Sequence, residues 1–368
     1  MHKTYFLIAG EASGDLHASN LIAALKTKQP EARFVGLGGD KMKAVGCTLY
    51  QDYRAMAFMG VVAVLRNLRN VRRNFRIAED ALLKEKPDVL ILIDYPSFNL
   101  KIAQFTKQHL PDTKIVYYIP PKVWAWKTFR IHKIAALCDE VLGIFPFEKD
   151  FYRKYGYRCT YVGNPTMDSI REWKKNNPTP SEKTQDHLIA ILPGSRKSEI
   201  SHCLPLMLKA ARNYPDYRIA VAVAPGMKEA FYSPYIKDGE TLTRDTYRLV
   251  SQATAAIVNS GTATLETALI GCPQEAVYYV ATSKVLGFLK PLLFKIPFFT
   301  LVNIILSREV IQEQVSYKFT ETCIREELGR LLHDEPYRQS MLHSYEELQT
   351  ILGPTPAAHN AASIITQL

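Results

Sequence analysis

Short runs of consecutive apolar residues recur along the chain, and segments with apolar positions every three or four residues lie between them. Such runs are typical of strands buried on both faces of a parallel sheet, and the segments between them are typical of amphipathic helices. We expect a helix over residues 16–26. The strands predicted in the first half are residues 4–10, 32–39, 87–94, 114–120, 138–145 and 159–165. This alternation predicts an α/β domain with a doubly wound sheet.

A polar stretch, REWKKNNPTPSEKTQDH, interrupts the pattern at residues 171–187 and is typical of an interdomain linker. A second alternation follows, with helices over 200–214 and 262–270 and helical residues from about 321 onward. Its predicted strands are residues 187–194, 217–225, 254–261 and 275–280. A chain of 368 residues exceeds one ordinary core. We therefore expect domains at 1–170 and 188–345, the linker at 171–187 and a C-terminal helix at 346–368, with the binding site in a cleft between the domains.

Composition narrows the class of partner. The chain is 47% hydrophobic and 22% charged, which is ordinary for a globular protein, but its net charge is +10. This excess favours an anionic partner such as phosphate-bearing ligands, a membrane surface or nucleic acid. The six cysteines form no CxxC pair and no zinc-ligand spacing, so we expect free thiols in a reducing compartment and no metal site.

The most apolar region, residues 285–306, contains Lys290, Pro291, Lys295 and Pro297. A spanning helix needs about 20 largely uncharged residues, so none is expected. The N-terminal apolar run is short and no cleavage-like site follows it. We expect a protein of the cytoplasm, either soluble or peripheral on a membrane.

GEASGD, residues 10–15, follows the first predicted strand and is expected to form a tight turn. Glu11 and Asp15 make this loop unsuited to phosphate. We expect them either to face sugar hydroxyls or to serve as turn and helix-start carboxylates. In IDYPSFN, Asp94 ends an apolar strand and Pro96 breaks it. A carboxylate at a strand end is placed for general-base catalysis, the alternative being an Asx turn into the next helix.

LPGSRKSEI, residues 192–200, joins a strand to a helix. Gly194 permits close backbone approach, and Ser195 is a candidate helix cap. Arg196 in the first turn opposes the helix dipole, a cost that a bound phosphate would offset. The alternative is a plain turn with a solvated arginine.

NSGTATLE, residues 259–266, is a second such joint. Ser260, Gly261 and Thr262 offer donors at a helix start, and Glu266, one turn further on, could accept from a ribose diol. The alternative is a simple N-cap with a surface glutamate. Two anion sites in one domain favour a nucleotide sugar. The chain has neither GxxxxGK[ST] nor GxGxxG, which argues against a P-loop enzyme and a nicotinamide enzyme.

Residues 58–76 carry five arginines and no acid. Apolar positions Val61, Val64, Leu65 and Leu68 form a stripe beside one that includes Arg66 and Arg69. The pattern is typical of a membrane-surface element, and the alternative is a core-facing helix. No nucleic-acid-binding motif accompanies it. YYIPPKVWAWK, residues 117–127, is either a cleft wall for a sugar or acyl chain or a rigid hydrophobic loop.

Eight motifs occur in the order seen in the lipid-A-disaccharide synthase family, which the chain resembles over nearly its whole length. They are GEASGD, FMG, DYPSFN, PPKVWAWK, PFE, VGNP, LPGSR and SGTATLE. The resemblance implies a GT-B fold, with two Rossmann-like domains facing a central cleft. It implies an inverting, metal-independent glycosyltransferase that needs no cofactor. The implied substrates are UDP-2,3-diacylglucosamine and 2,3-diacylglucosamine 1-phosphate (lipid X), and the implied products are lipid A disaccharide 1-phosphate and UDP.

The resemblance also implies a location and a set of roles. Family members are peripheral on the cytoplasmic surface of the inner membrane of Gram-negative bacteria, and they form homodimers with exchanged C-terminal portions. Asp94 or, as the second choice, Glu11 is the implied base, and the membrane patch falls on residues 61–68. The implied UDP-site residues are Arg196, Glu266, Asn303, Arg308 and Glu309.

The sequence departs from the family pattern at three points. Asn164 replaces the histidine of GHP, Val302 replaces the proline of LPN, and Ser316 replaces a common glutamine. Two other interpretations stay open at this point: another GT-B enzyme that uses a UDP-sugar, such as an epimerase or a peptidoglycan-type transferase, and a non-enzymatic basic protein that binds membranes.

Overall fold

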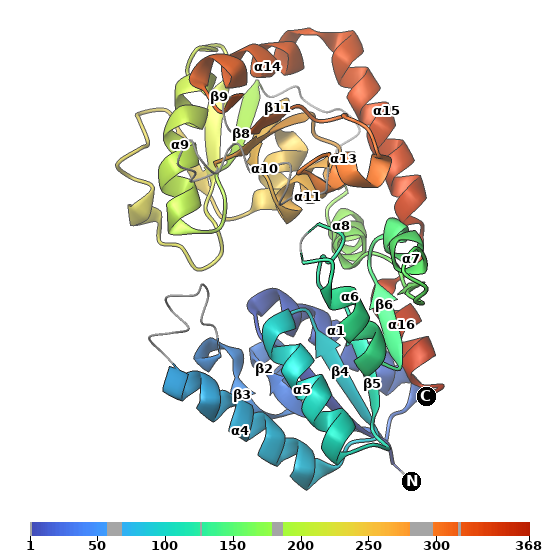
Figure 1. The fold of residues 1–368 in the computed structure, drawn as a ribbon. Helices are drawn as coiled ribbons and strands as arrows, with labels where there is room; N and C mark the ends of the chain where they lie inside the picture. Colours follow the sequence, from blue (N-terminus) through green and yellow to red (C-terminus); the bar gives the residue numbers. More distant parts are fainter. Residues whose placement is uncertain (1, 57–67, 126, 179–186, 280–296, 316–317) are drawn as a thin grey trace. The chain divides into compact units, whose positions relative to one another are not determined.

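The computed structural model describes residues 2–56, 68–125, 127–178, 187–279, 297–315 and 318–368 (Figure 1). The chain forms two compact units. The first unit comprises Met1–Pro165 together with Pro354–Leu368, and the second comprises Thr166–Gly353. The chain therefore leaves the first unit, builds the second and returns to the first.

The first unit contains a seven-stranded, wholly parallel sheet in the order β3-β2-β1-β4-β5-β6-β7. Its strands are β1 (Thr4–Ala9), β2 (Arg33–Gly38), β3 (Thr48–Asp52), β4 (Val89–Ile93), β5 (Lys114–Tyr118), β6 (Glu140–Gly143) and β7 (Thr160–Tyr161). Its helices are α1 (Ala12–Lys28), α2 (Asp40–Ala44), α4 (Leu68–Glu85), α5 (Pro96–His109), α6 (Arg130–Leu137), α7 (Pro146–Arg153) and α16 (Ala357–Ile365).

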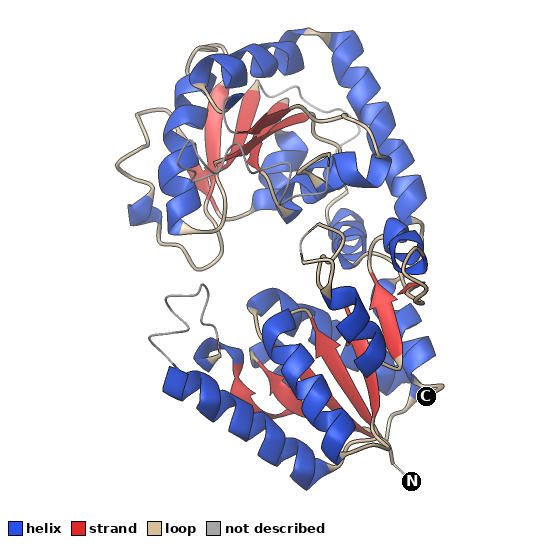
Figure 2. Ribbon diagram, viewed as in Figure 1, coloured by secondary structure: helices blue, strands red, loops and turns tan. Residues whose placement is uncertain are grey.

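Helices cover both faces of this sheet, as Figure 2 shows. One core cluster packs the sheet against α4, α5 and α6, through residues such as Leu82, Ile102 and Ile131. The other packs it against α1 and α16, through residues such as Leu21, Ile22 and Ile365. Burial on both faces explains why the central strands are continuous apolar runs.

The second unit contains a six-stranded parallel sheet in the order β10-β9-β8-β11-β12-β13. Its strands are β8 (Leu188–Leu192), β9 (Arg218–Ala222), β10 (Thr241–Thr243), β11 (Ala255–Asn259), β12 (Gln274–Tyr278) and β13 (Glu313–Val315). The helices that follow the first unit in sequence are α8 (Pro165–Asn176), α9 (Lys197–Ala211), α10 (Thr246–Gln252), α11 (Thr262–Ile270), α13 (Leu301–Leu306), α14 (Glu321–His333) and α15 (Glu335–Leu352).

Two wholly parallel sheets with this strand order confirm the prediction of two Rossmann-like domains. In each sheet the strand order reverses beside the first strand, between β1 and β4 in the first and between β8 and β11 in the second. Ligands of doubly wound sheets bind at such a switch point, beyond the carboxyl ends of the strands. The first unit's switch point is followed in sequence by Gly10 and Asp94, and the second's by the loops that begin at Pro193 and Ser260.

The unit boundaries differ from those predicted. Residues 171–176 of the predicted linker belong to α8, and residues 179–186 lie outside the described ranges. The predicted single helix over 346–368 is wrong. Gly353, with φ of 69°, ends α15, and the apolar face of α16 packs in the first unit instead. Figure 1 shows α16 beside α1, the helix that it contacts.

Among the helices within the described ranges, none has the length and apolarity needed to cross a membrane. The apolar stretch predicted over 285–306 lies outside those ranges as far as residue 296. All six cysteines are free thiols.

Candidate active site

The switch point of the first sheet brings Glu11 and Asp94 to neighbouring strand ends, because Ala9 of β1 pairs with Ile93 of β4. Glu11 is the N-cap residue of α1, and Asp94 directly follows β4. The structure thus places the two predicted catalytic carboxylates on adjacent connections.

Asp94 adopts an uncommon backbone conformation. Its φ is 44° and that of Tyr95 is 43°, a left-handed pair without glycine. Such conformations persist only where surrounding contacts impose them, and they cluster at functional sites. Here the Asp94 carbonyl accepts hydrogen bonds from Asn99 Nδ2 and the Tyr117 hydroxyl, both at 2.7 Å, and its N–H donates to the Ile119 carbonyl at 3.2 Å. The backbone that carries the Asp94 carboxyl is therefore held by three hydrogen bonds.

The electrostatics of Asp94 suit a base. Desolvation by the surrounding protein raises the pKa of Asp94, and the positive charge of Lys122 together with a backbone hydrogen bond from Tyr95 opposes this shift. Desolvation lowers the pKa of Lys122, and the charges of Asp94 and Glu148 oppose that shift. A raised carboxyl pKa strengthens the basicity of the ionised form, as general-base catalysis requires.

Lys122 and Glu148 are residues that the sequence did not predict for the site. Glu148, from PFE, is 1% exposed and accepts hydrogen bonds from the N–H groups of Ile144 (2.8 Å) and Phe145 (3.0 Å) and from Trp124 Nε1 (3.3 Å). Burial is the largest cause that raises the pKa of Glu148 to about 7. Glu148 thereby ties α7 to the 121–125 loop, which carries Lys122.

GEASGD differs from the tight turn predicted, because α1 already begins at Ala12. A Cβ at Gly10 would lie 2.3 Å from the ring of Tyr95, so the glycine admits the residue next to Asp94. Asp15 is 3% exposed and accepts from the N–H groups of Gly39, Lys41 and Met42. Asp15 is therefore a helix-start carboxylate for α2, one of the two roles expected, and of this pair Glu11 remains a candidate to contact substrate.

In the second unit, Gly194 lies at the closest approach of the two predicted phosphate loops. Its φ is 110°, and a Cβ there would lie 2.6 Å from Asn259 Nδ2 and 2.8 Å from Glu199 Oε2. Asn259 is the last residue of β11 and directly precedes Ser260. The structure thus brings the LPGSR and SGTATLE loops together.

The start of α9 is occupied by a side chain of the same helix. Glu199 Oε2 accepts from the N–H groups of Ser195 (3.0 Å) and Arg196 (3.2 Å), and Glu199 Oε1 accepts from Arg196 Nη1 (3.2 Å). Ser195 does not cap the helix as predicted; Arg196 is the N-cap residue, because Glu199 in the first turn reaches back to the loop. The exposed Arg196 guanidinium is accordingly a salt-bridge partner of Glu199.

The start of α11 is different. Gly261 is its N-cap residue, and within the described residues no side chain caps it and no acid lies in its first turn. Gly261 and Thr262 are exposed, and a Cβ at Gly261 would meet open space. The Ser260 N–H donates a hydrogen bond to the Val277 carbonyl at 2.8 Å. The N–H groups that follow in the first turn of α11 suit a phosphate oxygen.

Glu266 lies one turn further along α11 and is partly buried. Its Oε1 accepts a hydrogen bond from the Tyr247 hydroxyl at 3.0 Å. Desolvation is the largest cause that raises the pKa of Glu266, and the Tyr247 hydrogen bond opposes it.

The remaining predicted residues of the UDP site separate into two groups. Asn303 is fully buried: its Nδ2 donates to the Ile311 carbonyl and Glu313 Oε1, and its Oδ1 accepts from the N–H groups of Val310 and Ile311. These four bonds use the whole capacity of the amide, so Asn303 holds the 310–313 segment in place. Arg308 and Glu309 are exposed, and Arg308 pairs with Glu347 at 2.6 Å.

Two other predictions concern the first unit. Asn164, at the position of the family's histidine, is 1% exposed and donates to the Ile144 carbonyl at 3.0 Å. Of the predicted membrane patch, Val61, Val64, Leu65 and Arg66 lie outside the described residues, and Leu68 begins α4. Trp126 of the 117–127 motif and, in the second unit, Ser316 also lie outside the described residues.

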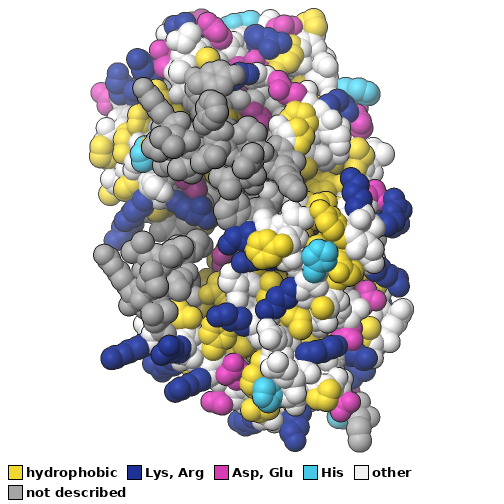
Figure 3. All heavy atoms as spheres, viewed as in Figure 1, with side chains coloured by type: hydrophobic (Ala, Val, Ile, Leu, Met, Phe, Trp, Pro, Cys, Tyr) yellow, Lys and Arg dark blue, Asp and Glu magenta, His cyan; other side chains and the backbone are white. Residues whose placement is uncertain are grey.

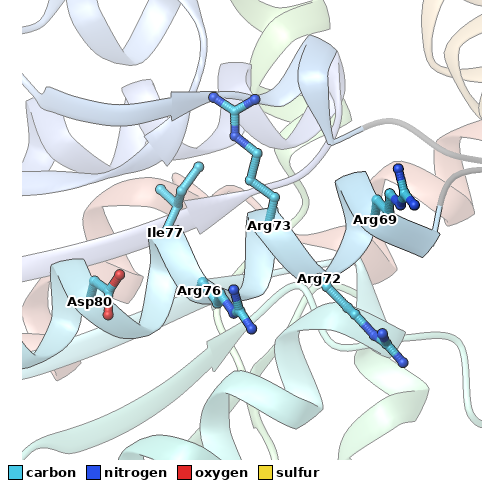
Figure 4. Close-up of a pocket in the computed structure, with 6 residues that line it drawn as sticks. All are labelled: Arg69, Arg72, Arg73, Arg76, Ile77 and Asp80. Carbon is cyan, nitrogen blue, oxygen red and sulfur yellow. The ribbon is translucent and has the colours of Figure 1, made fainter.

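Arg69, Arg72, Arg73 and Arg76 form what we call the arginine face of α4. With Ile77 and Asp80 they line an open groove of about 330 Å³. Figure 4 shows Arg69 and Arg73 pointing to one side of the helix and Arg72 and Arg76 to the other. Within the described part of the chain, none of the four is in a salt bridge. Figure 3 shows Lys and Arg side chains gathered where α4 lies.

Two Rossmann-like units with parallel sheets, each with its predicted motifs at the switch point, define the GT-B class of fold. Solved structures agree with this class. The calicheamicin glycosyltransferase matches with a TM-score of 0.58 and 13% identity, over 100% of this chain and 98% of that one. A UDP-GlcNAc 2-epimerase of Neisseria meningitidis bound to UDP-GlcNAc matches with a TM-score of 0.57 and 12% identity, over 99% and 98% of the two chains.

Sequence comparison is more specific. The pattern of the lipid-A-disaccharide synthetase family matches residues 5–364, and the chain belongs to that family. The lipid-A-disaccharide synthase of Myxococcus xanthus is 34% identical over 98% of this chain and 96% of the relative. That of Syntrophus aciditrophicus is 35% identical over the same shares. The family prediction made from the eight motifs is confirmed.

Proposed function

We propose that this protein is an inverting hexosyltransferase that condenses UDP-2,3-diacylglucosamine with 2,3-diacylglucosamine 1-phosphate to form lipid A disaccharide 1-phosphate and UDP. Family membership supports the reaction over a UDP-sugar epimerase, which shares the fold alone. The observation that carries the proposal is Asp94, whose carboxyl follows the strand at the switch point on a backbone held in a strained conformation by three hydrogen bonds.

The first unit binds the acceptor. Asp94 takes the proton from the acceptor 6-hydroxyl while that oxygen attacks the anomeric carbon of the donor. The bond between this carbon and the diphosphate oxygen breaks in the same displacement, so the anomeric centre inverts and UDP leaves. Glu11, on the neighbouring connection, orients the sugar hydroxyls.

The second unit binds UDP. Arg196 and the first turn of α11 stabilise the negative charge that develops on the diphosphate, which lowers the barrier to its departure. Gly194 and Ser195 shape the first loop, whereas Ser260, Gly261 and Thr262 present the second. Glu266 accepts from the ribose, and Asn303 positions the segment that directly follows Arg308 and Glu309.

UDP release measured with and without lipid X tests the reaction. Release that proceeds equally without lipid X would contradict the proposal, because the leaving group should depart only when the acceptor attacks. An epimerase would instead interconvert the donor without an acceptor.

Asp94→Asn tests the base. We expect kcat to fall by about 10²–10⁴-fold, because the amide cannot take a proton. Asp88→Asn is the matched control: Asp88 precedes the same strand at its other end, where its carboxyl accepts from the Thr4 N–H at 2.7 Å. Near-full turnover by Asp94→Asn would show that another group is the base.

We also propose peripheral attachment to the cytoplasmic surface of the inner membrane, through residues 61–68 and the arginine face of α4. Four arginines within two turns suit anionic headgroups. Charge reversal of Arg69 and Arg72 should abolish sedimentation with anionic vesicles, and unchanged sedimentation would refute the attachment site.

We propose a homodimer as well. The family resemblance supports it. The position of α16 also supports it, because only four residues, Gly353–Pro356, join α16 to α15, and exchange of α16 between two copies could use this connection as its hinge. Light scattering that gives a monomer mass at assay concentrations would exclude it.

A further inference from the structure

Tyr247 is a tyrosine outside every sequence motif whose hydroxyl meets a carboxylate of the UDP site. It lies in the first turn of α10, and its hydroxyl donates to Glu266 Oε1 at 3.0 Å. Its ring packs edge-on against Trp173 of α8, with ring centroids 5.9 Å apart and an interplanar angle of 81°. The ring is thus held from one side while the hydroxyl reaches the carboxylate on the other.

This hydrogen bond solves a problem created by burial. Desolvation favours the protonated form of Glu266, whereas the ionised carboxylate is the stronger acceptor for sugar hydroxyls. The Tyr247 hydroxyl stabilises the ionised form. Burial and the nearby Glu266 charge raise the pKa of Tyr247 itself, so the phenol remains a donor throughout the neutral range.

The bond also sets geometry. Among the described residues, the Tyr247 hydroxyl is the one hydrogen-bond donor recorded for the Glu266 side chain, and it occupies Oε1. This leaves Oε2 to accept from a ligand. Thr262, at the start of the same helix, lies about 6 Å back along the helix axis, a span suited to a ribosyl phosphate.

We infer that Tyr247 is a positioning residue for ribose recognition, which orients the Glu266 carboxylate that accepts from the ribose hydroxyls of the nucleotide. The inference rests on the proposed UDP site and adds a residue to it. It makes hydroxyl recognition, rather than phosphate binding, the property that depends on Tyr247.

Calorimetric binding of UDP, 2′-deoxy-UDP and 3′-deoxy-UDP to the full chain tests this. The wild-type protein should prefer UDP over the more affected analogue by about 10–100-fold, the range for hydrogen bonds to charged groups. In Tyr247→Phe this preference should fall to about threefold or less, with most of the change in UDP affinity. Phenylalanine keeps the ring against Trp173, and an unchanged melting temperature checks that the fold is intact.

Tyr214→Phe is the matched control, because the Tyr214 hydroxyl donates to the Arg325 carbonyl at 2.7 Å in the same unit. It should leave the preference for UDP unchanged. A double-mutant cycle completes the test: in a Glu266→Gln background, Tyr247→Phe should change the preference by less than about twofold.

The outcomes separate the two proposals. If UDP binds the wild-type protein but Tyr247→Phe keeps the full preference, Tyr247 has no positioning role. Equal wild-type affinity for all three nucleotides would likewise overturn the inference. Failure of the wild-type protein to bind UDP would overturn the proposed UDP site and the inference with it.

Discussion

Two helices of the second unit, α9 and α11, follow the adjacent strands β8 and β11, but the N-termini of the two helices differ in how they are capped. At α9, Glu199 accepts the N–H groups of Ser195 and Arg196 and pairs with the Arg196 guanidinium. At α11, no side chain of the described residues caps the exposed turn at Gly261. One helix start is satisfied by a side chain of its own first turn, whereas at the other the described residues provide no capping side chain.

The difference teaches that, in the proposed UDP site, two similar sequence patterns would bind the diphosphate by different means. The N–H groups of Ser195 and Arg196 already donate to Glu199. The start of α9 would therefore bind a phosphate mainly through the Arg196 side chain. The first turn of α11 offers backbone N–H groups and the helix dipole. Substitutions should therefore affect the two sites through different quantities.

The largest expected effect is that of Arg196→Ala. The substitution should raise the activation free energy by about 3 kcal/mol, so turnover should fall roughly 100-fold. This is comparable to the loss of one oxyanion donor. Arg153→Ala, which removes another exposed arginine from an i,i+3 pair, here with Asp150, is the control. Steady-state kinetics with saturating lipid X provide the measurement, and unchanged UDP affinity together with unchanged turnover would remove Arg196 from the site.

The two glycines should separate stability from binding. Gly194→Ala forces a side chain into a left-handed backbone and against Asn259, so we expect a loss of about 2 kcal/mol in the free energy of unfolding. At Gly261 the new methyl group would enter open space from a backbone with extended φ. Gly261→Ala should therefore leave the free energy of unfolding unchanged while UDP affinity declines. Urea titration and calorimetry measure the two effects, and equal destabilisation by both variants would refute the contrast.

Glu199→Gln should lower the free energy of unfolding by about 1 kcal/mol, because it weakens the capping interaction at the start of α9. UDP affinity should rise a few-fold, because a negative charge that competes for Arg196 is lost. Glu321→Gln, which removes an acid from the first turn of α14, is the control. Weaker UDP binding by Glu199→Gln would mean that Glu199 orients Arg196 rather than competing with the ligand.

The smallest effect concerns pH and the α11 site. Because burial raises the pKa of Glu266, its carboxylate is protonated at a higher pH than an ordinary glutamate as the solution is acidified. UDP affinity should therefore decline roughly 2–5-fold as pH falls through that raised pKa. The free energy of unfolding of the ligand-free protein should instead increase as pH falls. The stabilising contribution of Glu266 is present below its unfolded-state pKa and is lost as pH rises through its raised folded-state pKa. Glu266→Gln should remove both slopes.

Much of the fold could be predicted from local signals. Central strands such as β4 are continuous apolar runs, and α11 begins and ends as predicted because Gly261 and Gly271 flank it. The strands β3, β10 and β13 were missed, since they lie at or near sheet edges and carry no long apolar run. The start of α1 was placed too late, because Glu11 is not a residue that typically caps helices.

The positions of Asp94, Arg196 and Glu266 at a strand end or a helix start could be predicted, because one motif holds each of them. Lys122 and Glu148 could not be predicted in this way, because the interactions of Lys122 with Asp94 and with Glu148 depend on the folding of three connections that are distant in sequence. Asn303 could be located but not interpreted: only its burial and four hydrogen bonds reveal that its amide holds the chain rather than a ligand.

The return of α16 to the first unit has a consequence for biosynthesis. Ala361, Ala362 and Ile365 are fully buried there against α1 and its neighbours, so the N-terminal unit lacks part of its core until the last residues are made. At roughly 5–20 residues per second, translation of residues 166–353 takes on the order of 10–40 s. Throughout that interval the apolar groove for α16 is exposed on the nascent chain, where chaperones can bind it and where truncation of the message would leave it permanently open.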